Sequence, residues 1–261
     1  MYSPLNIPQN LRTRFGQRSR QLTQSALMAV VLATTSALPA LAEPADPTLI
    51  SLGFPTSGQP RSTAGAGQRA IGNEDCVATN QGVPGLTALT ANTAVSKAAE
   101  PNPTFLVYIP QTNALLGEFT LTLDSSTERV YQETVFLPEE PSILEITLPQ
   151  EIALRTDRVY DWRFAIVCDL QDPNNNVVAN GKVERTAVTP ELAAQLSQAS
   201  GLAKAELYAN AGIWHEAAAL AVRMRSQNST EWSELLEAVG FTEPSGGVQQ
   251  PLVDAPIVSQ Q

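Results

Sequence analysis

The stretch Gly117-Glu-Phe-Thr-Leu-Thr-Leu123 decides the fold class of this 261-residue chain. Apolar side chains occupy every second position, at Phe119, Leu121 and Leu123, and polar side chains occupy the positions between them. Successive side chains of a β-strand point to opposite faces of its sheet, so this alternation predicts a strand with one buried face and one face in water. Sheets with one wet face are typically antiparallel.

Several segments around this strand have the same character. Each is short, rich in β-branched and aromatic residues, and bounded by turn residues such as Pro, Asn and Asp. They span 104–109, 129–137, 143–148, 159–169 and 177–186. Short strands at a spacing of roughly 8–12 residues, with no helix between them, favour an antiparallel, Ig-like β-sandwich over residues 103–189.

Helical patterns begin at Pro190, a residue typical of the first position of a helix. Three more helical stretches follow, at 202–211, 213–226 and 230–239. Tyr208, Gly212 and Trp214 reproduce the turn of a tetratricopeptide helical hairpin, and one such unit cannot bury its own apolar face. We therefore expect an α+β chain in which a C-terminal helical domain at 190–242, containing this hairpin, packs on the sandwich.

The ends of the chain have different compositions from the centre. Residues 1–42 run from basic to apolar to small side chains, which predicts a cleavable secretory signal peptide. An uncleaved membrane anchor is the alternative, but the apolar run is shorter than the about 20 residues that a span needs. Residues 43–102, rich in Pro, Gly, Ser, Thr and Ala, are interpreted as an extended low-complexity arm anchored by Cys76, and residues 243–261 as a disordered tail.

Export has consequences for charge and location. The segment 1–42 carries four Arg and no acidic residue, so its removal takes the formal net charge of the chain from −10 to −14. Nucleic acid and anionic lipid are poor partners for such an acidic surface. The expected location is periplasmic or extracellular, and the mature chain is not expected to be embedded in a membrane.

Cys76 and Cys168 are the two cysteines of the sequence, and both lie in the part expected to be exported. A disulfide is the default state of such a pair in an oxidising compartment. The alternative is a reactive thiol with His215 as its base. A zinc site would need more soft ligands than the chain offers, and no cofactor is predicted.

Five residues are candidates for ligand binding. Trp162, Tyr208 and Trp214 could line a carbohydrate or peptide platform, although core and interdomain packing is the favoured interpretation of each. Arg61 and Arg69 flank a Gly-rich segment that could hold an anion. That segment lacks the Lys-Ser/Thr end of a phosphate loop, so a flexible linker is favoured over an anion site.

Catalytic and metal chemistry has little support in the sequence. His215 is the single histidine, no nucleophile motif accompanies it, and no catalytic residue is predicted. Asp169, Asp172 and Asn174 could offer oxygen ligands to calcium, but their spacing matches no calcium loop and an ordinary turn also explains them. Facing carboxylates for glycoside hydrolysis could come from the acidic residues Glu118, Asp161, Asp169, Asp172 and Glu184.

Short motifs follow one another in order along most of residues 61–241. They are Gly67-x-Arg69, Cys76, Leu86-Thr-Ala-Leu89, Asn102-Pro-Thr-Phe105-x-x-Tyr108-x-Pro110, Glu118-Phe119-x-Leu121, Tyr160-x-Trp162, Cys168-Asp169 and Tyr208-Ala-x-Ala-Gly-Ile-Trp214. Together they resemble a family of cyanobacterial exported proteins catalogued as a domain of unknown function. The resemblance implies a secreted or periplasmic protein in which both cysteines belong to the common pattern, and it implies no known activity or ligand.

These observations favour a non-catalytic binding or interaction module of the cell envelope. Its helical hairpin would offer a groove to a protein or peptide partner, because hairpins of this type serve protein contacts elsewhere. One alternative is an envelope hydrolase that uses carboxylates on the sheet to act on glycans. The other is a structural envelope component that assembles with copies of itself.

Overall fold

The computed structural model describes residues 52–55, 76–78, 83–124, 126–227, 229–243 and 245–260. All of them belong to one compact unit, Pro47–Gln261. The predicted signal peptide at 1–42 lies outside the described residues, as do Arg61 and Arg69.

The alternating stretch at 117–123 lies inside a five-stranded sheet. In spatial order the strands are β2 (Ser96–Ala98), β8 (Val177–Arg185), β7 (Val159–Ile166), β4 (Leu116–Leu123) and β5 (Arg129–Phe136). Their pairings are antiparallel except for the parallel contact of β2 with β8. Phe119 and Leu121 are fully buried and Thr120 is half-buried, which confirms the predicted two-faced strand.

A second sheet has four strands. Their order is β1 (Thr87–Ala88), β3 (Thr104–Ile109), β6 (Ser142–Thr147) and β9 (Ile257–Ser259), with β6 and β9 parallel and the other pairs antiparallel. Strand β3 is buried along its whole length because its two faces meet two different cores. Phe105 and Val107 face Phe119 and the other inward residues of the five-stranded sheet, whereas Leu106 and Tyr108 pack against the helices.

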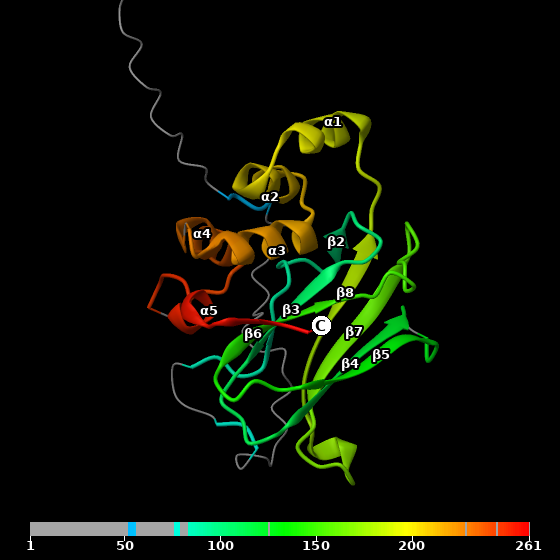
Figure 1. The fold of residues 1–261 in the computed structure, drawn as a ribbon, viewed down its shortest axis with the longest axis vertical. Helices are drawn as coiled ribbons and strands as arrows, with labels where there is room; N and C mark the ends of the chain where they lie inside the picture. The colour runs from blue at the N-terminus through cyan, green and yellow to red at the C-terminus, as the bar shows by residue number, and fades with distance from the viewer. Residues whose placement is uncertain are drawn as a thin grey trace, which may run out of the picture. The chain divides into compact units, whose positions relative to one another are not determined.

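Five helices are described, namely α1 (Pro190–Gln198), α2 (Gly201–Asn210), α3 (Trp214–Met224), α4 (Ser229–Ala238) and α5 (Gln250–Asp254). They form a layer in which α3 contacts β3 of the four-stranded sheet and α1 packs on α2, farther from the sheets (Figure 1). Helix α1 begins as predicted, with Pro190 in its first turn and the Thr189 hydroxyl accepting the backbone N–H of Leu192 at 3.2 Å. Gly212, at φ +71°, joins α2 to α3, which pack against each other. The chain is therefore α+β with two largely antiparallel sheets.

The predicted disordered tail at 243–261 was wrong. Residues 250–254 form α5 and residues 257–259 form β9, which pairs with β6. Leu252 is fully buried, and its carbonyl accepts the indole N–H of Trp232 at 3.1 Å. The prediction relied on the Gln- and Pro-rich composition of the segment. It overlooked Leu252 and Val253, which pack in the helical core.

The described part of the predicted arm at 43–102 also joins the fold. It contributes β1 and β2, and Leu52 and Phe54 are buried in the helical core. Strands of two or three residues are too short to show an alternating pattern in the sequence. They are recognised as strands only by their pairing with longer ones. Among the described residues, no helix has the length and apolar character needed to cross a bilayer.

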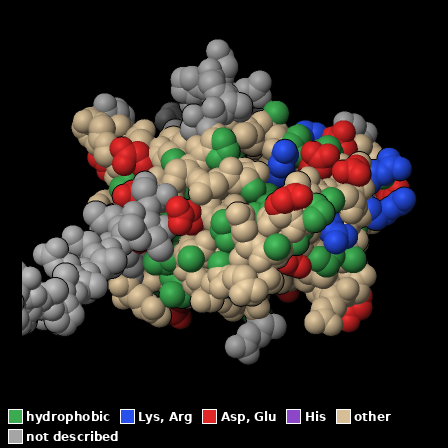
Figure 2. Space-filling model, turned by 90° about the horizontal axis from the view of Figure 1, so that it is seen from above, with side chains coloured by type: hydrophobic (Ala, Val, Ile, Leu, Met, Phe, Trp, Pro, Cys, Tyr) green, Lys and Arg blue, Asp and Glu red, His purple; other side chains and the backbone are tan. Residues whose placement is uncertain are grey.

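Charged side chains are unevenly spread over the surface. Seen from above, the visible Lys and Arg side chains gather on the side where the five-stranded sheet lies, with Asp and Glu between them (Figure 2). This mixture of signs provides both positive and negative groups for ligand contacts near the sheet.

Candidate functional site

Cys76 and Cys168 form a disulfide with their Cα atoms 5.7 Å apart, as predicted. A reactive thiol at either position is thereby excluded in this state of the protein. The carbonyl of Cys76 also accepts hydrogen bonds from the Asn113 backbone N–H at 3.0 Å and from the Thr112 hydroxyl at 2.7 Å. The disulfide thus ties the N-terminal segment to the loop that follows β7.

The three candidate aromatic residues do not form an exposed platform. Trp162, Tyr208 and Trp214 are at most 4 % exposed. The indole N–H of Trp214 donates to the Leu89 carbonyl at 2.8 Å, and its ring stands edge-on to Phe54 with the centroids 5.5 Å apart. These rings fill the core, where their large apolar surfaces are removed from water.

His215 is a core residue. Its side chain is buried in α3, Nδ1 lies 2.9 Å from the Thr104 carbonyl, and its ring centroid is 5.0 Å from that of Phe105. Burial lowers the pKa of His215 to about 4, against the opposing effect of the Thr104 hydrogen bond. The imidazole is therefore neutral at pH 7 and enclosed by packed side chains.

Acidification is expected to destabilise the fold through His215. The unfolded chain binds a proton near the ordinary His pKa of 6.5, whereas folded His215 does so at about 4, so stability falls as the pH drops through this window. The loss at pH 5 is about 2 kcal/mol for this group. Burial raises the pKa of the neighbouring Glu216, which has the opposite effect on stability. Urea unfolding at pH 7 and pH 5 measures the net loss.

The matched control for this prediction is His215→Phe, which keeps an aromatic ring and removes the titrating group. Its free energy of unfolding should fall less between pH 7 and pH 5 than that of the wild type. Equal losses in the two proteins would contradict the assignment to His215.

The calcium candidates form a self-contained turn. Asp172 caps the 3-10 helix η1 (Pro173–Asn175) by accepting the Asn174 backbone N–H at 3.0 Å. Asp169 accepts the Gln171 backbone N–H at 2.8 Å, a hydrogen bond that holds the pKa of this carboxyl below its ordinary value. In the part of the chain that the structure describes, no three His, Cys, Asp or Glu side chains are grouped to hold a metal ion. These oxygens serve the turn that sequence analysis considered as the alternative.

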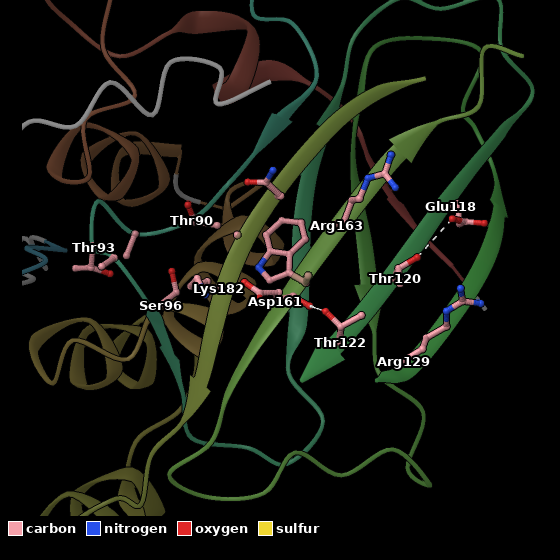
Figure 3. Close-up of a pocket in the computed structure, with 15 residues that line it drawn as sticks. Thr90, Thr93, Ser96, Glu118, Thr120, Thr122, Arg129, Asp161, Arg163 and Lys182 are labelled. Carbon is pink, nitrogen blue, oxygen red and sulfur yellow. Dashed lines mark hydrogen bonds and ion pairs between the residues drawn. The ribbon is translucent and has the colours of Figure 1, made fainter. Parts of the chain in front are cut away.

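A hollow of about 810 Å³ lies beside β8 and over the polar face of the five-stranded sheet. We call it the β8 hollow. One side is lined by Thr90 and Thr93 of the segment between β1 and β2 and by Ser96 of β2, and the other by Thr120 and Thr122 of β4 (Figure 3). Hydroxyl groups from distant parts of the sequence thus surround a shared space.

Charged residues lie between these two walls. Lys182 of β8 pairs with Asp161 of β7 at 2.9 Å, and both residues line the hollow (Figure 3). Lys182 also pairs with Asp124. Hydrogen bonds to Asp124 and then to Asp161 raise the pKa of Lys182. Arg163 of β7 lines the same hollow, is exposed, and makes no ion pair with any described residue. The hollow therefore offers two exposed cations that make no ion pair with a described residue, Arg163 and Arg129 of β5, beside the ion pairs of Lys182.

Of the acidic residues considered for hydrolysis, the two that line the hollow do not form a close pair. Glu118 and Asp161 both line the hollow, but Asp161 stands opposite Thr122, four residues along β4 from Glu118. That offset separates their backbones by about 13 Å along the strand. Paired glycosidase carboxylates are about 5–9.5 Å apart. Of the other candidates, Asp169 and Asp172 lie in the η1 turn.

Comparison with known proteins gives one result. A family model described as Domain of Unknown Function (DUF928) matches residues 64–250. The chain belongs to the DUF928 family. The matched range contains both disulfide cysteines and every element that lines the β8 hollow, so the hollow is part of the DUF928 domain. No curated protein and no solved structure matches the chain.

Sequence analysis missed one residue pair in this DUF928 domain. Gly181 of β8 stands opposite Trp162 of β7, and a Cβ at Gly181 would lie 2.7 Å from the indole Nε1 of Trp162. Glycine is therefore required where the ring passes under β8. The Nε1 atom is buried and has no hydrogen-bond partner among the described residues, and both residues line the β8 hollow. A glycine inside a predicted strand was the signal that could have identified this close approach.

Proposed function

We propose that this DUF928 chain is an exported, non-catalytic binding module of the cell envelope and that the β8 hollow is its binding surface for a protein or peptide partner. The hollow carries the proposal, because it combines hydroxyl groups, an amide and both signs of charge on a paired sheet. Binding sites are concave and use a few well-placed polar groups for specificity. The disulfide and the expected signal peptide support a periplasmic or extracellular location.

The roles of the two halves differ from the initial hypothesis. Tyr208 and Trp214 of the expected helical hairpin are buried, so they stabilise the fold and are not available to a ligand. In this proposal the two sheets form an Ig-like sandwich, and α2 and α3 support its four-stranded sheet. The five-stranded sheet carries the partner on its polar face.

Filling the hollow is expected to abolish partner capture. Thr120 is half-buried at the centre of this face, and Thr120→Trp would place an indole in the space that a partner needs. Affinity-tagged protein, exported and disulfide-bonded, is used to recover partners from the exported fraction. The recovered partner should fall by about tenfold or more, equivalent to about 1.4 kcal/mol of binding free energy.

Thr134→Trp is the matched control, since Thr134 is exposed on β5 and does not line the hollow. It should recover the partner as well as the wild type does. Equal recovery by Thr120→Trp would place the binding surface elsewhere, and recovery of nothing by the wild type would count against a binding module. Self-assembly of the purified protein would favour a structural component instead.

The hydrolase alternative has one supporting observation, the presence of Glu118 and Asp161 in the same hollow. Their offset along β4 and the engagement of Asp161 by Lys182 favour binding over acid–base chemistry. Turnover of glycan or ester substrates that is abolished by Glu118→Gln or Asp161→Asn would reverse this ranking.

A further inference from the structure

Strand β8 has an incompletely paired edge. It pairs with β7 from Val177 to Glu184, but β2 covers its other edge only at 183–185. Alternate residues of an antiparallel strand direct both backbone N–H and C=O away from the partner strand. Along 177–182 these groups therefore face a side on which the described part of the chain places no strand. Unpaired strand edges are templates for a further strand.

The β8 hollow lies beside this edge. Asn180, Gly181 and Lys182 of β8 line it, and Thr90 and Thr93 stand across from them on the segment leading into β2 (Figure 3). Six residues of strand span roughly 20 Å, enough to pair with a peptide of about five or six residues. The edge is thus accompanied by a space on its open side.

An unsatisfied donor lies beneath β8 at this point of the strand. Trp162 is 1 % exposed, its indole passes under Gly181 on the core side of β8, and its N–H has no partner among the described residues. A buried donor without a partner costs about 1–3 kcal/mol. The other tryptophans of the sequence, Trp214 and Trp232, both donate to backbone carbonyls. A ligand carbonyl would satisfy Trp162 in the same way.

We propose that the β8 hollow binds an extended peptide segment, which adds to the open edge of β8 as a short strand and accepts the Trp162 indole N–H through one backbone carbonyl. The inference rests on the proposed function and names its ligand class. A peptide fits better than a glycan, because its backbone N–H and C=O groups can pair with those of the strand edge. No lining residue presents an exposed aromatic face on which a sugar ring could stack.

The test starts from displayed random hexapeptides selected on the intact, disulfide-bonded protein. An enriched peptide is synthesised with a fluorophore, and its binding is measured by anisotropy. Trp162→Phe, which keeps an aromatic ring of smaller size and removes the N–H, is expected to weaken binding by about 5- to 10-fold. Trp232→Phe is the matched control, because its N–H bonds to the Leu252 carbonyl within the helical core. It should leave the affinity unchanged.

A second measurement does not depend on any variant folding. Methylating the peptide nitrogens one at a time should abolish binding at alternate positions and spare the positions between them, because only alternate N–H groups face β8. Enrichment of no peptide, or binding without this alternation, would overturn the inference. If glycans bind instead and Thr120→Trp prevents it, the binding module stands and the peptide inference fails. If neither class binds, both fail.

Discussion

The double variant Cys76→Ser/Cys168→Ser is expected to lose about 4 to 5 kcal/mol of unfolding free energy, because the disulfide closes a loop between residues 92 apart in sequence and restricts the unfolded chain. Domains of this size have a total stability of about 5–15 kcal/mol. The variant should therefore unfold at a much lower urea concentration than the wild type. Urea titration followed by tryptophan fluorescence measures the difference.

Reduction provides the control for this prediction. A reducing agent should destabilise the wild type by a similar amount and leave the double variant unchanged, since the variant has no bond to reduce. A wild type that unfolds at the same urea concentration with and without reductant would contradict the assigned role. Retained binding in the reduced protein would show that the hollow survives without the disulfide.

The strands could be predicted from sequence where they have two distinct environments. Alternation in β4 follows from one face being packed on Phe105 and its neighbours and the other carrying Thr120. Strand β3 is apolar throughout because it separates the two cores, and its length and β-branched content identified it. Strands β1, β2 and β9 have two or three residues each, and pairing with longer strands defines them.

The β8 hollow could not be predicted in the same way. Its lining comes from the segment at 90–96 and from β4, β5, β7 and β8, which only the sheet order brings together. Sequence shows which side chains are polar but not that Thr93 and Lys182 share a space. The aromatic candidates show the converse difficulty. A tryptophan such as Trp162 or Trp214 has the same sequence signal whether it binds a ligand or fills a core, and both are buried.

Residues 250–261 offer the sharpest contrast between composition and structure. Their removal is expected to lower the free energy of unfolding by at least about 3 kcal/mol, since burying each of Leu252 and Val253 contributes about 1.5–3 kcal/mol. The truncation also leaves the Trp232 indole N–H without its acceptor. A disordered tail could be removed at no cost, so urea unfolding of the truncated protein separates the two interpretations directly.

Point variants locate this effect within the segment. Leu252→Ala should cost about 2–5 kcal/mol because it leaves a cavity beside Trp232 in the helical core. Asp254→Ala is the matched control on the same helix, since Asp254 is exposed and its replacement should change stability by less than about 0.5 kcal/mol. Ser259→Ala tests the far end, where the Ser259 hydroxyl donates to the buried carboxylate of Glu145 at 2.7 Å. A large loss at Leu252 and none at Asp254 would show that α5 is held by its buried face, and equal small losses at both would contradict the packing of this segment in the core.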